Sequence, residues 1–386
     1  MTVRITWDRA SARRFERQFL ATPVAAGTPT AVADVVGAMC GAHAQVLSAA
    51  EVSVGVRADG VTRADVRAAL WGLRSLVKTH GPRGTVHLLP ARELSFWSTA
   101  LTAVPSGASP FPPGVRLTEE QTAQVVAAIG DALDGRCLTV DELGEEVVAR
   151  TGSWAGDRVM PAFQDLWPRW RQVLHRAGQA GALCFGPNRG RKVTYTRPPR
   201  FEPLEPDAAL RALVHHYLHA YGPSTPAYFA KWLAAPGGWA TGLFTELAAG
   251  GEIEEVLFEG APAWVATGDT DFPEAPVRGV RLLPYFDSYV IAGQPRELLF
   301  PGAAYRRALA GGQAGNFPVL LVDGVVAGVW HQRRRGRRTT VTVEPLGRLT
   351  ARQRRELGEQ VERVGNTLES AGAELVVGAV NVGPHA

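Results

Sequence analysis

DAALRALVHHYLHAYGPSTPAYFAKWLAAPGGWATGLFTELAAGGEIEEVLFEGAPAWVATGD, residues 207–269, is the stretch of sequence that decides the fold. Apolar residues recur at helical spacing until Gly222-Pro223, and the later Gly250-Gly251 and Glu259-Gly260 pairs are turn signals. The expected elements are a helix ending at Gly222-Pro223, helices at 226–233 and 239–249, and strands at 252–258 and 263–266. Three helices followed by a hairpin is the order of a winged helix.

The same order occurs twice more, although no fixed repeat period relates the sequences. One copy has helices at 31–40, 43–55 and 63–71 and strands at 76–79 and 85–89. The other has helices at 119–133, 140–150 and 166–177 and strands at 182–185 and 192–196. Both hairpin turns are rich in glycine, proline and arginine, as the wing of a winged helix is. We therefore predict three tandem winged-helix units, with a Pro-, Ser- and Gly-rich linker at Ala103 to Gly114.

After Asp269 the pattern changes to strands. Runs at 277–284, 318–322, 325–332 and 339–345 are strand-like, and Asp323-Gly324 is a strong hairpin signal. An amphipathic helix at 350–371 and a last strand at 374–382 complete the expected small β-barrel domain. The predicted fold class is α+β. The predicted domains are 1–102 (first winged helix, with the catalytic motif), 115–200 (second), 205–270 (third) and 275–386 (β-barrel with a basic hairpin).

Composition excludes several classes of protein. The 386 residues are 46% hydrophobic and 20% charged, which is enough to bury a large core, and no apolar run reaches the ~18 residues of a membrane span. The three cysteines are far apart, and His215 and His219 have no carboxylate or cysteine at a matching spacing. We expect a cytoplasmic, monomeric protein that has no contact with the membrane and requires neither a metal nor a cofactor.

The arginines are clustered although the overall charge is only +4. A run from Arg333 to Arg338, interrupted by Gly336, falls at a predicted hairpin tip. Five like charges repel each other at a solvated turn, whereas each gains phosphate contacts and counterion release in a DNA groove. A merely solvated turn is the alternative interpretation. The candidate DNA-binding residues are Arg83, Arg189, Arg191, His331, Arg333, Arg334, Arg335, Arg337 and Arg338.

Three segments resemble a known family. They are Cys40-Gly41-Ala42-His43-Ala44-Gln45, Ser75 to Pro90, and Leu282-Leu283-Pro284-Tyr285-Phe286-Asp287-Ser288-Tyr289. Together they are similar to the HTH_42 winged-helix proteins, bacterial DNA glycosylases of the AlkZ/YcaQ type, and the resemblance covers nearly the whole chain. The family keeps an acidic residue at the position of Asp287, for which we expect a structural role.

The resemblance implies that His43 and Gln45 are the catalytic residues. The family signature is Gln, a small or apolar residue, then Gln or Asp, so that Gln45 matches and His43 departs from it. A glutamine carbonyl can orient a water molecule, and an imidazole, with an unperturbed pKa near ~6.5, can accept its proton. Thr85 and His87 alternate with apolar residues and are candidate substrate contacts, with core or edge packing as the alternative.

The implied activity is hydrolysis of the N-glycosidic bond of N7-alkylated guanine in double-stranded DNA. Departures from the Gln-any-Asp pattern resemble a subgroup of self-resistance enzymes that remove bulky or crosslinking adducts of the producer's own genotoxin. Two alternatives stay open. One is a DNA-binding regulator built on winged helices without catalysis, and the other is an inactive protein that retains the fold.

Overall fold

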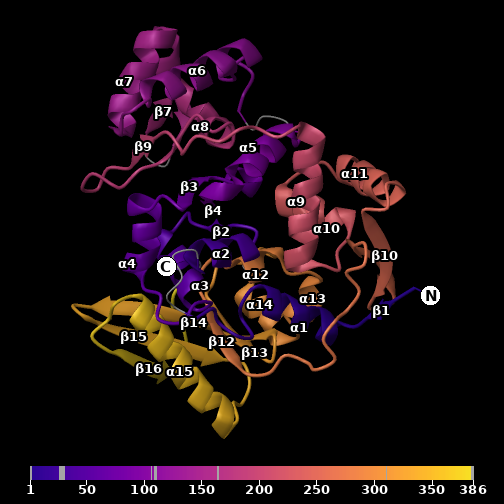
Figure 1. Cartoon of the computed structure of the whole chain (residues 1–386). Coiled ribbons are helices and arrows are strands. Elements are labelled where there is room, and N and C mark those ends of the chain that lie inside the picture. The colour runs from indigo at the N-terminus through magenta and orange to yellow at the C-terminus, as the bar shows by residue number, and fades with distance from the viewer. Residues whose placement is uncertain are drawn as a thin grey trace. The chain divides into compact units, whose positions relative to one another are not determined.

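The computed structural model describes residues 2–25, 31–105, 107, 111–162, 165–309 and 311–383, so the expected linker at Ala103 to Gly114 lies partly outside the described residues. The chain forms two compact units. The first comprises Met1–Ala69, Val214–Trp232 and Gly237–Ala386, and the second comprises Leu70–Leu213 and Leu233–Pro236. The architecture is mixed α+β (Figure 1). The division into three winged helices stays a prediction.

The first unit contains the predicted Glu259-Gly260 hairpin. Both turn residues have positive φ, 50° and 79°, as a type I′ turn requires. The amino terminus adds a parallel strand to this hairpin, with Arg4 opposite Leu257. The elements of this part are β1 (Arg4–Ile5), α1 (Trp7–Arg17), α2 (Ala31–Ala38), β2 (Ala42–His43), α3 (Leu47–Gly55), α4 (Arg63–Arg67), α10 (Pro226–Leu233), α11 (Gly237–Ala249), β10 (Ile253–Phe258) and β11 (Ala261–Ala266).

The carboxyl-terminal part of this unit is an open sheet, which corrects the expected β-barrel. Strand order is β12-β13-β14-β15-β16, and β16 adds in parallel to β15, so β12 and β16 remain the two edges and the described residues contain no closed barrel. The helix α15 packs on the sheet instead (Figure 1). The elements are β12 (Val280–Leu283), α12 (Ser288–Ala292), α13 (Arg296–Leu299), α14 (Ala303–Ala308), β13 (Val319–Val322), β14 (Val325–Arg335), β15 (Arg338–Pro345), α15 (Ala351–Thr367) and β16 (Ala373–Val377).

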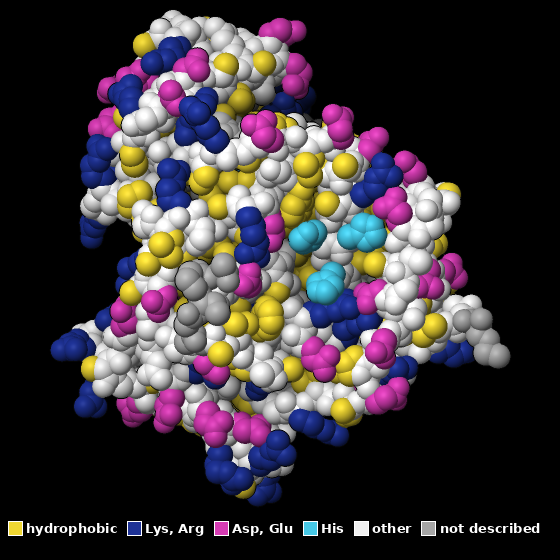
Figure 2. Space-filling view, viewed as in Figure 1, with side chains coloured by type: hydrophobic (Ala, Val, Ile, Leu, Met, Phe, Trp, Pro, Cys, Tyr) yellow, Lys and Arg dark blue, Asp and Glu magenta, His cyan; other side chains and the backbone are white. Residues whose placement is uncertain are grey.

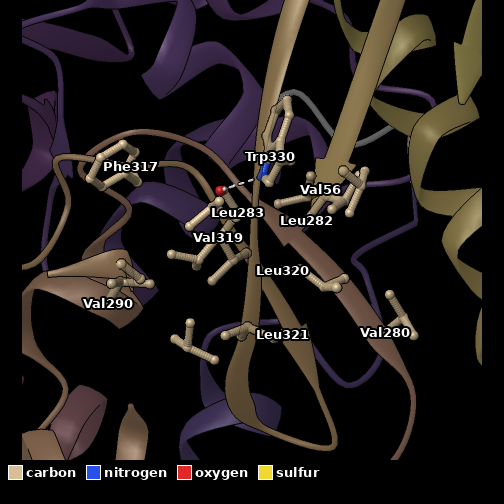
Figure 3. Packing of buried hydrophobic residues seen from close by; sticks show 14 of the residues in the cluster. Val56, Val280, Leu282, Leu283, Val290, Phe317, Val319, Leu320, Leu321 and Trp330 are labelled. Carbon is tan, nitrogen blue, oxygen red and sulfur yellow. Dashed lines mark hydrogen bonds between the residues drawn. The ribbon is translucent and has the colours of Figure 1, made fainter. Parts of the chain in front are cut away.

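The core of the first unit joins α3, α15 and this sheet. Figure 3 shows Val56, the residue after α3, among aliphatic residues of β12 and β13. Trp330 is buried in this core, and its indole N–H donates to the Leu283 carbonyl at 2.9 Å. Gly55 of α3 faces Thr367 of α15 so closely that a Cβ there would lie 2.2 Å from the threonine Oγ1. The close approach of the two helices therefore depends on a glycine.

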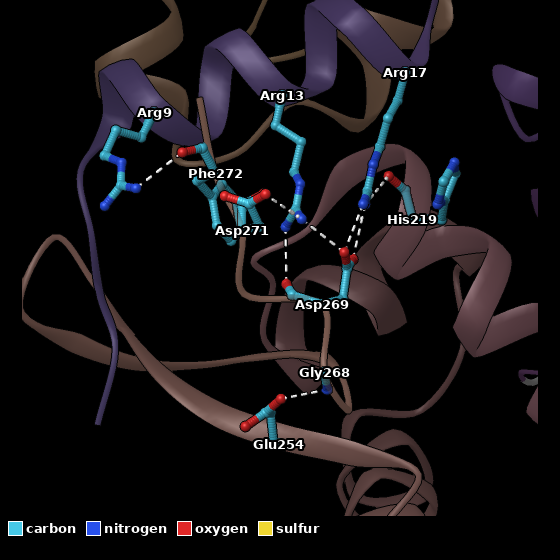
Figure 4. Close-up of polar contacts among 9 residues, drawn as sticks. All are labelled: Arg9, Arg13, Arg17, His219, Glu254, Gly268, Asp269, Asp271 and Phe272. Atoms are coloured by element: carbon cyan, nitrogen blue, oxygen red, sulfur yellow. Dashed lines mark hydrogen bonds and ion pairs between the residues drawn. The ribbon is translucent and has the colours of Figure 1, made fainter. Parts of the chain in front are cut away.

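Arginines on one face of α1 hold the segment that follows β11 (Figure 4). Arg13 and Arg17 both bind the carboxylate of Asp269, with Nη2–Oδ1 distances of 2.6 Å. Arg9 donates to the Phe272 carbonyl at 2.9 Å, and the Arg13 guanidinium lies 3.7 Å from the centre of the Phe272 ring. The i, i+4, i+8 spacing puts all three arginines on one side of the helix. They are structural residues rather than free cations.

The second unit follows the predicted order of helices less closely. A helix was expected at 166–177, but Trp167 precedes a proline, which disfavours helical backbone, and residues 166–168 pair with 158–161 as a strand. Capping boxes at Thr118 and Thr139 start the two longer helices. The elements are β3 (Leu76–His80), β4 (Val86–Pro90), α5 (Leu94–Ala103), α6 (Glu119–Ala132), β5 (Leu138–Thr139), α7 (Val140–Thr151), β6 (Arg158–Pro161), β7 (Leu166–Pro168), α8 (Leu174–Gln179), β8 (Cys184–Phe185) and β9 (Thr194–Thr196), while α9 (Pro206–Tyr221) belongs to both units.

His80 at the end of β3 should make stability sensitive to acid. Burial, with a smaller contribution from His175, lowers the pKa of His80 to about 4. The unfolded chain binds this proton near pH 6.5, so stability is lost as the pH falls from about 6.5 towards 4, by about 2 kcal/mol between pH 7 and pH 5. Urea denaturation at both pH values should show that His80→Gln loses less stability on acidification than the wild type. Equal losses in the two proteins would exclude His80 as the cause.

Candidate functional site

The motif His43-Ala44-Gln45 lies ahead of α3, not on it. The predicted helix at 43–55 is wrong at its start: His43 ends strand β2, Gln45 lies in a bend, and α3 begins at Leu47. Because neither residue belongs to a helix, helix geometry does not set the angle between their two side chains. His43 is buried, with 8% of its surface exposed, whereas Gln45 is exposed. The site therefore combines an exposed amide with a neighbouring buried imidazole.

The chain enters this motif through a tight helix end. Cys40 and Gly41 have φ values of 56° and 90°, and the N–H groups of both return to carbonyls of α2, Cys40 to Gly37 at 2.8 Å and Gly41 to Val36 at 3.0 Å. These two bonds form a Schellman motif. The Tyr221 hydroxyl donates to the Met39 carbonyl at 2.5 Å, and the Ser288 hydroxyl donates to the Gly41 carbonyl at 2.8 Å. Two distant segments thus fix the backbone that precedes His43.

The segment after β12 supplies the partner of the imidazole ring. Phe286 has a positive φ of 55°, and its ring lies 4.5 Å from that of His43 at an angle of 31°. The next residue, Asp287, is buried and accepts two hydrogen bonds from the fully buried Arg57, both at 2.8 Å. Ser53 donates to the same carboxylate at 2.7 Å, and the N–H of Tyr289 adds a bond at 3.0 Å. Asp287 therefore has a structural role beneath the site.

The arginine-rich hairpin is longer than the sequence indicated. β14 runs to Arg335 and β15 begins at Arg338, so Arg333, Arg334 and Arg335 belong to a strand and only Gly336 and Arg337 form the turn. All five arginines are exposed. His331 is half-buried on β14, and burial, followed by the charge of Arg333, lowers its pKa. The hairpin projects a basic end beyond the edge strand β16, whose pairing starts at Thr339.

In the second unit, Thr85 and His87 make local contacts. The Thr85 hydroxyl donates to the Pro82 carbonyl at 3.0 Å, and Thr85 itself precedes β4. His87 is buried, and its Nδ1–H donates to the Thr85 carbonyl at 2.9 Å. Arg83 has a φ of 60° at the tip of the same hairpin and lines a hollow of about 600 Å³ with His175 and Arg176.

In the turn between β8 and β9, which the sequence predicts as the second wing, one of the two candidate arginines binds other residues of the second unit. Arg189 is exposed but bonds Glu142 at 2.8 Å and the Cys137 carbonyl at 2.8 Å. The Thr139 backbone and Arg189 together lower the pKa of Glu142. Arg191 is exposed on the same turn. Arg191 is thus better placed than Arg189 to meet a phosphate.

The side chains of the segment that leads into α8, and of α8 itself, contact other parts of the second unit. Gln172 donates to the Val115 carbonyl at 2.8 Å, Arg169 donates to the same carbonyl at 3.1 Å, and Arg176 binds Glu119 at 3.0 Å. Gln and Arg are the side chains that read base edges. In this structure these side chains are engaged in contacts within the second unit.

Among the described residues, no three His, Cys, Asp or Glu side chains gather as a metal site would require. No helix in the described part of the chain is long and apolar enough to cross a membrane.

The sequence and the fold are similar to those of known DNA glycosylases. The family model "DNA glycosylase AlkZ-like" matches residues 36–367. The chain is 33% identical over 340 residues to an interstrand DNA cross-link repair glycosylase of Streptomyces sahachiroi, covering 85% of this chain and 88% of that protein. The solved structure of Streptomyces sahachiroi DNA glycosylase AlkZ matches with a TM-score of 0.81 and 29% identity, over 97% of this chain and 100% of that one.

The fold and these matches define a DNA glycosylase, an enzyme that hydrolyses N-glycosidic bonds in DNA. More narrowly, the chain belongs to the AlkZ-like DNA glycosylase family.

The ion pair beneath the site should be essential for stability. Asp287→Ala leaves the Arg57 guanidinium buried without its counter-charge, which costs about 3–5 kcal/mol of unfolding free energy. The double change Arg57→Met with Asp287→Leu removes both charges and should cost less than the single one. Urea denaturation of the three proteins provides the comparison. A loss below about 1 kcal/mol in Asp287→Ala would contradict the assigned role.

Proposed function

We propose that the protein excises N7-alkylated guanine from double-stranded DNA, and that its substrates are bulky or crosslinking genotoxin adducts. The relative in Streptomyces sahachiroi, named as a cross-link repair glycosylase, supports this substrate class. The observation that carries the proposal is the exposed Gln45 beside the buried His43 on a backbone fixed by Tyr221 and Ser288. A role in self-resistance or in alkylation repair follows from this activity.

The proposed chemistry needs little acid catalysis. Alkylation at N7 makes the base cationic, so it leaves readily while the sugar develops positive charge at C1′. What the enzyme must supply is a positioned water molecule. The amide oxygen of Gln45 accepts a hydrogen bond from that water, and the imidazole of His43 accepts its proton. Both groups act on the water, so no covalent intermediate with the protein is formed.

The remaining candidate residues hold the duplex. We assign phosphate and minor-groove contacts to the basic hairpin, whose exposed arginines are suited to it. Arg83 and Arg191 add contacts in the second unit, where Arg189 contributes less because it binds Glu142. We assign substrate contacts to Thr85 and His87 of the β3–β4 hairpin. The protein acts as a monomer in the cytoplasm and needs neither a metal nor a cofactor.

The decisive test is incubation of the purified protein with duplexes that carry a defined N7-guanine adduct. Release of the alkylated base with formation of an abasic site is expected from N7-methylguanine and from a bulky N7 adduct. A regulator without catalysis would bind one operator sequence tightly and release nothing. Binding without release from any adduct would therefore reject the proposed activity.

Gln45→Ala should slow excision by about 10²–10³-fold, because one preorganised group is removed from the transition state. DNA affinity should change little, since a neutral side chain neutralises no phosphate charge and releases no counterion. Single-turnover rates at saturating enzyme separate these two effects. Ser48→Ala, three residues further along the chain, serves as the matched control. A loss below about threefold in Gln45→Ala would remove Gln45 from the chemistry.

His43→Gln restores the residue more common in the family and should retain excision, with a flatter pH dependence between about pH 5.5 and 7.5. His43→Ala should be much slower, because it removes the acceptor for the water proton. Rate profiles across this pH range distinguish the three proteins. If wild type and both variants had the same rates throughout, His43 would be a packing residue beneath Phe286.

A further inference from the structure

The structure carries a second basic surface, at the opposite end of α15 from the arginine hairpin. It consists of Arg278 before β12, Arg348 after β15, and Arg352, Arg354 and Arg355 in the first turns of α15, and is called here the α15 patch. All five side chains are exposed. Figure 2 shows basic side chains gathered at this end of α15, at the bottom of the view.

The patch has more positive charge than its partners neutralise. Arg278 lies 3.9 Å from Asp323, and Arg352 binds Glu356 at 2.7 Å; these are the carboxylates that pair with the patch among the described residues. Both pairs are solvent-exposed, with 68% and 72% of the two arginine side chains accessible. Exposed ion pairs of this kind contribute little to stability. The stability of the fold therefore does not explain why five arginines gather at this end of α15.

Arg352, Arg354 and Arg355 lie in the first turns of α15, where positive charge destabilises a helix. Cations at a helix amino terminus oppose the helix dipole. Other helices of this chain follow the rule: α6 begins with Glu119 and Glu120, and α7 with Asp141 and Glu142. The first turn of α15 contains no acidic residue. The capping box occupies the N–H groups of Thr350 and Gln353, and the exposed arginine side chains are the groups of the patch that can reach a phosphate.

Distance separates the α15 patch from the hairpin. After the carboxyl end of α15, the Ala371 N–H donates to the Arg337 carbonyl at 2.7 Å, which places the turn of the hairpin near that end. The 17 residues of α15 span about 25 Å. A duplex that rises 3.4 Å per base pair covers this distance in about seven base pairs.

We propose that the α15 patch is a second contact for the phosphate backbone of duplex DNA, one that engages DNA several base pairs from the segment bound by the hairpin. This inference rests on the DNA partner of the proposed function but not on the adduct or on catalysis. It makes affinity depend on duplex length, since only a duplex long enough to reach both surfaces gains the additional phosphate contacts.

The test measures affinity for an undamaged stem-loop of 5 base pairs, which spans about 17 Å, and for an undamaged duplex of 32 base pairs, as a function of salt concentration. Fluorescence anisotropy compares the wild type with Arg352→Gln/Arg354→Gln/Arg355→Gln and with the hairpin variant Arg334→Gln/Arg335→Gln/Arg337→Gln. Exposed arginines outside both surfaces, changed as Arg4→Gln/Arg306→Gln, provide the control. Glutamine is a good helix former, and circular dichroism checks that α15 is intact.

For the patch variant, the slope of log K against log[salt] should become shallower by up to about 2.7 on the 32-base-pair duplex and change much less on the 5-base-pair stem, which is too short to reach both surfaces. The hairpin variant should lose slope on both duplexes. An unchanged slope on the long duplex, or the same loss on both lengths, overturns the proposal. The binding test uses undamaged DNA and therefore does not depend on excision. If the patch variant loses salt slope only on the long duplex while the wild type releases no adduct, the proposed activity is rejected and this inference stands.

Discussion

The buried ion pair between Arg57 and Asp287 is the interaction on which the candidate site depends. It joins the segment just after α3 to the segment that follows β12, and both side chains are fully buried. Charges removed from water are costly unless every lone pair and N–H finds a partner. Here Ser53 and the Tyr289 backbone also bind the carboxylate, and the Ser53 carbonyl accepts another bond from Arg57, which leaves the buried Nε of Arg57 without a hydrogen-bond partner among the described residues. The pair therefore specifies one arrangement of the two segments.

That arrangement determines where the candidate motif His43-Ala44-Gln45 lies. Fixing Asp287 also fixes Phe286 on one side and Ser288 on the other: the first packs on the His43 ring, and the second binds the Gly41 carbonyl. Gln45 lies in the bend that follows His43 and Ala44, beyond the residues that these contacts hold, and its side chain is exposed. A rigid support beneath an exposed polar group is the condition for positioning a water molecule without a covalent step.

Local signals predicted those parts of the fold whose geometry is local. The Glu259-Gly260 and Asp323-Gly324 turns were predictable because both residues of each pair adopt positive φ, which few residue types accept. The open sheet was not, since the parallel addition of β16 depends on a pairing that no turn specifies. The start of α3 was misplaced for a similar reason: the Schellman end of α2 and its two distant hydroxyl partners have no periodic signature in the sequence.

The arginines show why residue type alone does not define a DNA-binding surface. Arg14 is buried and gives its N–H groups to the carbonyls of Gly222, Pro223 and Gln294, and burial lowers its pKa. Arg189 is exposed yet bound to Glu142. Whether an arginine is available to a phosphate depends on the carboxylates and carbonyls that the fold brings to it, and these come from elsewhere in the chain. The sequence could indicate which clusters are basic, but only the three-dimensional neighbours separate the arginines that stabilise the protein from those left to meet DNA.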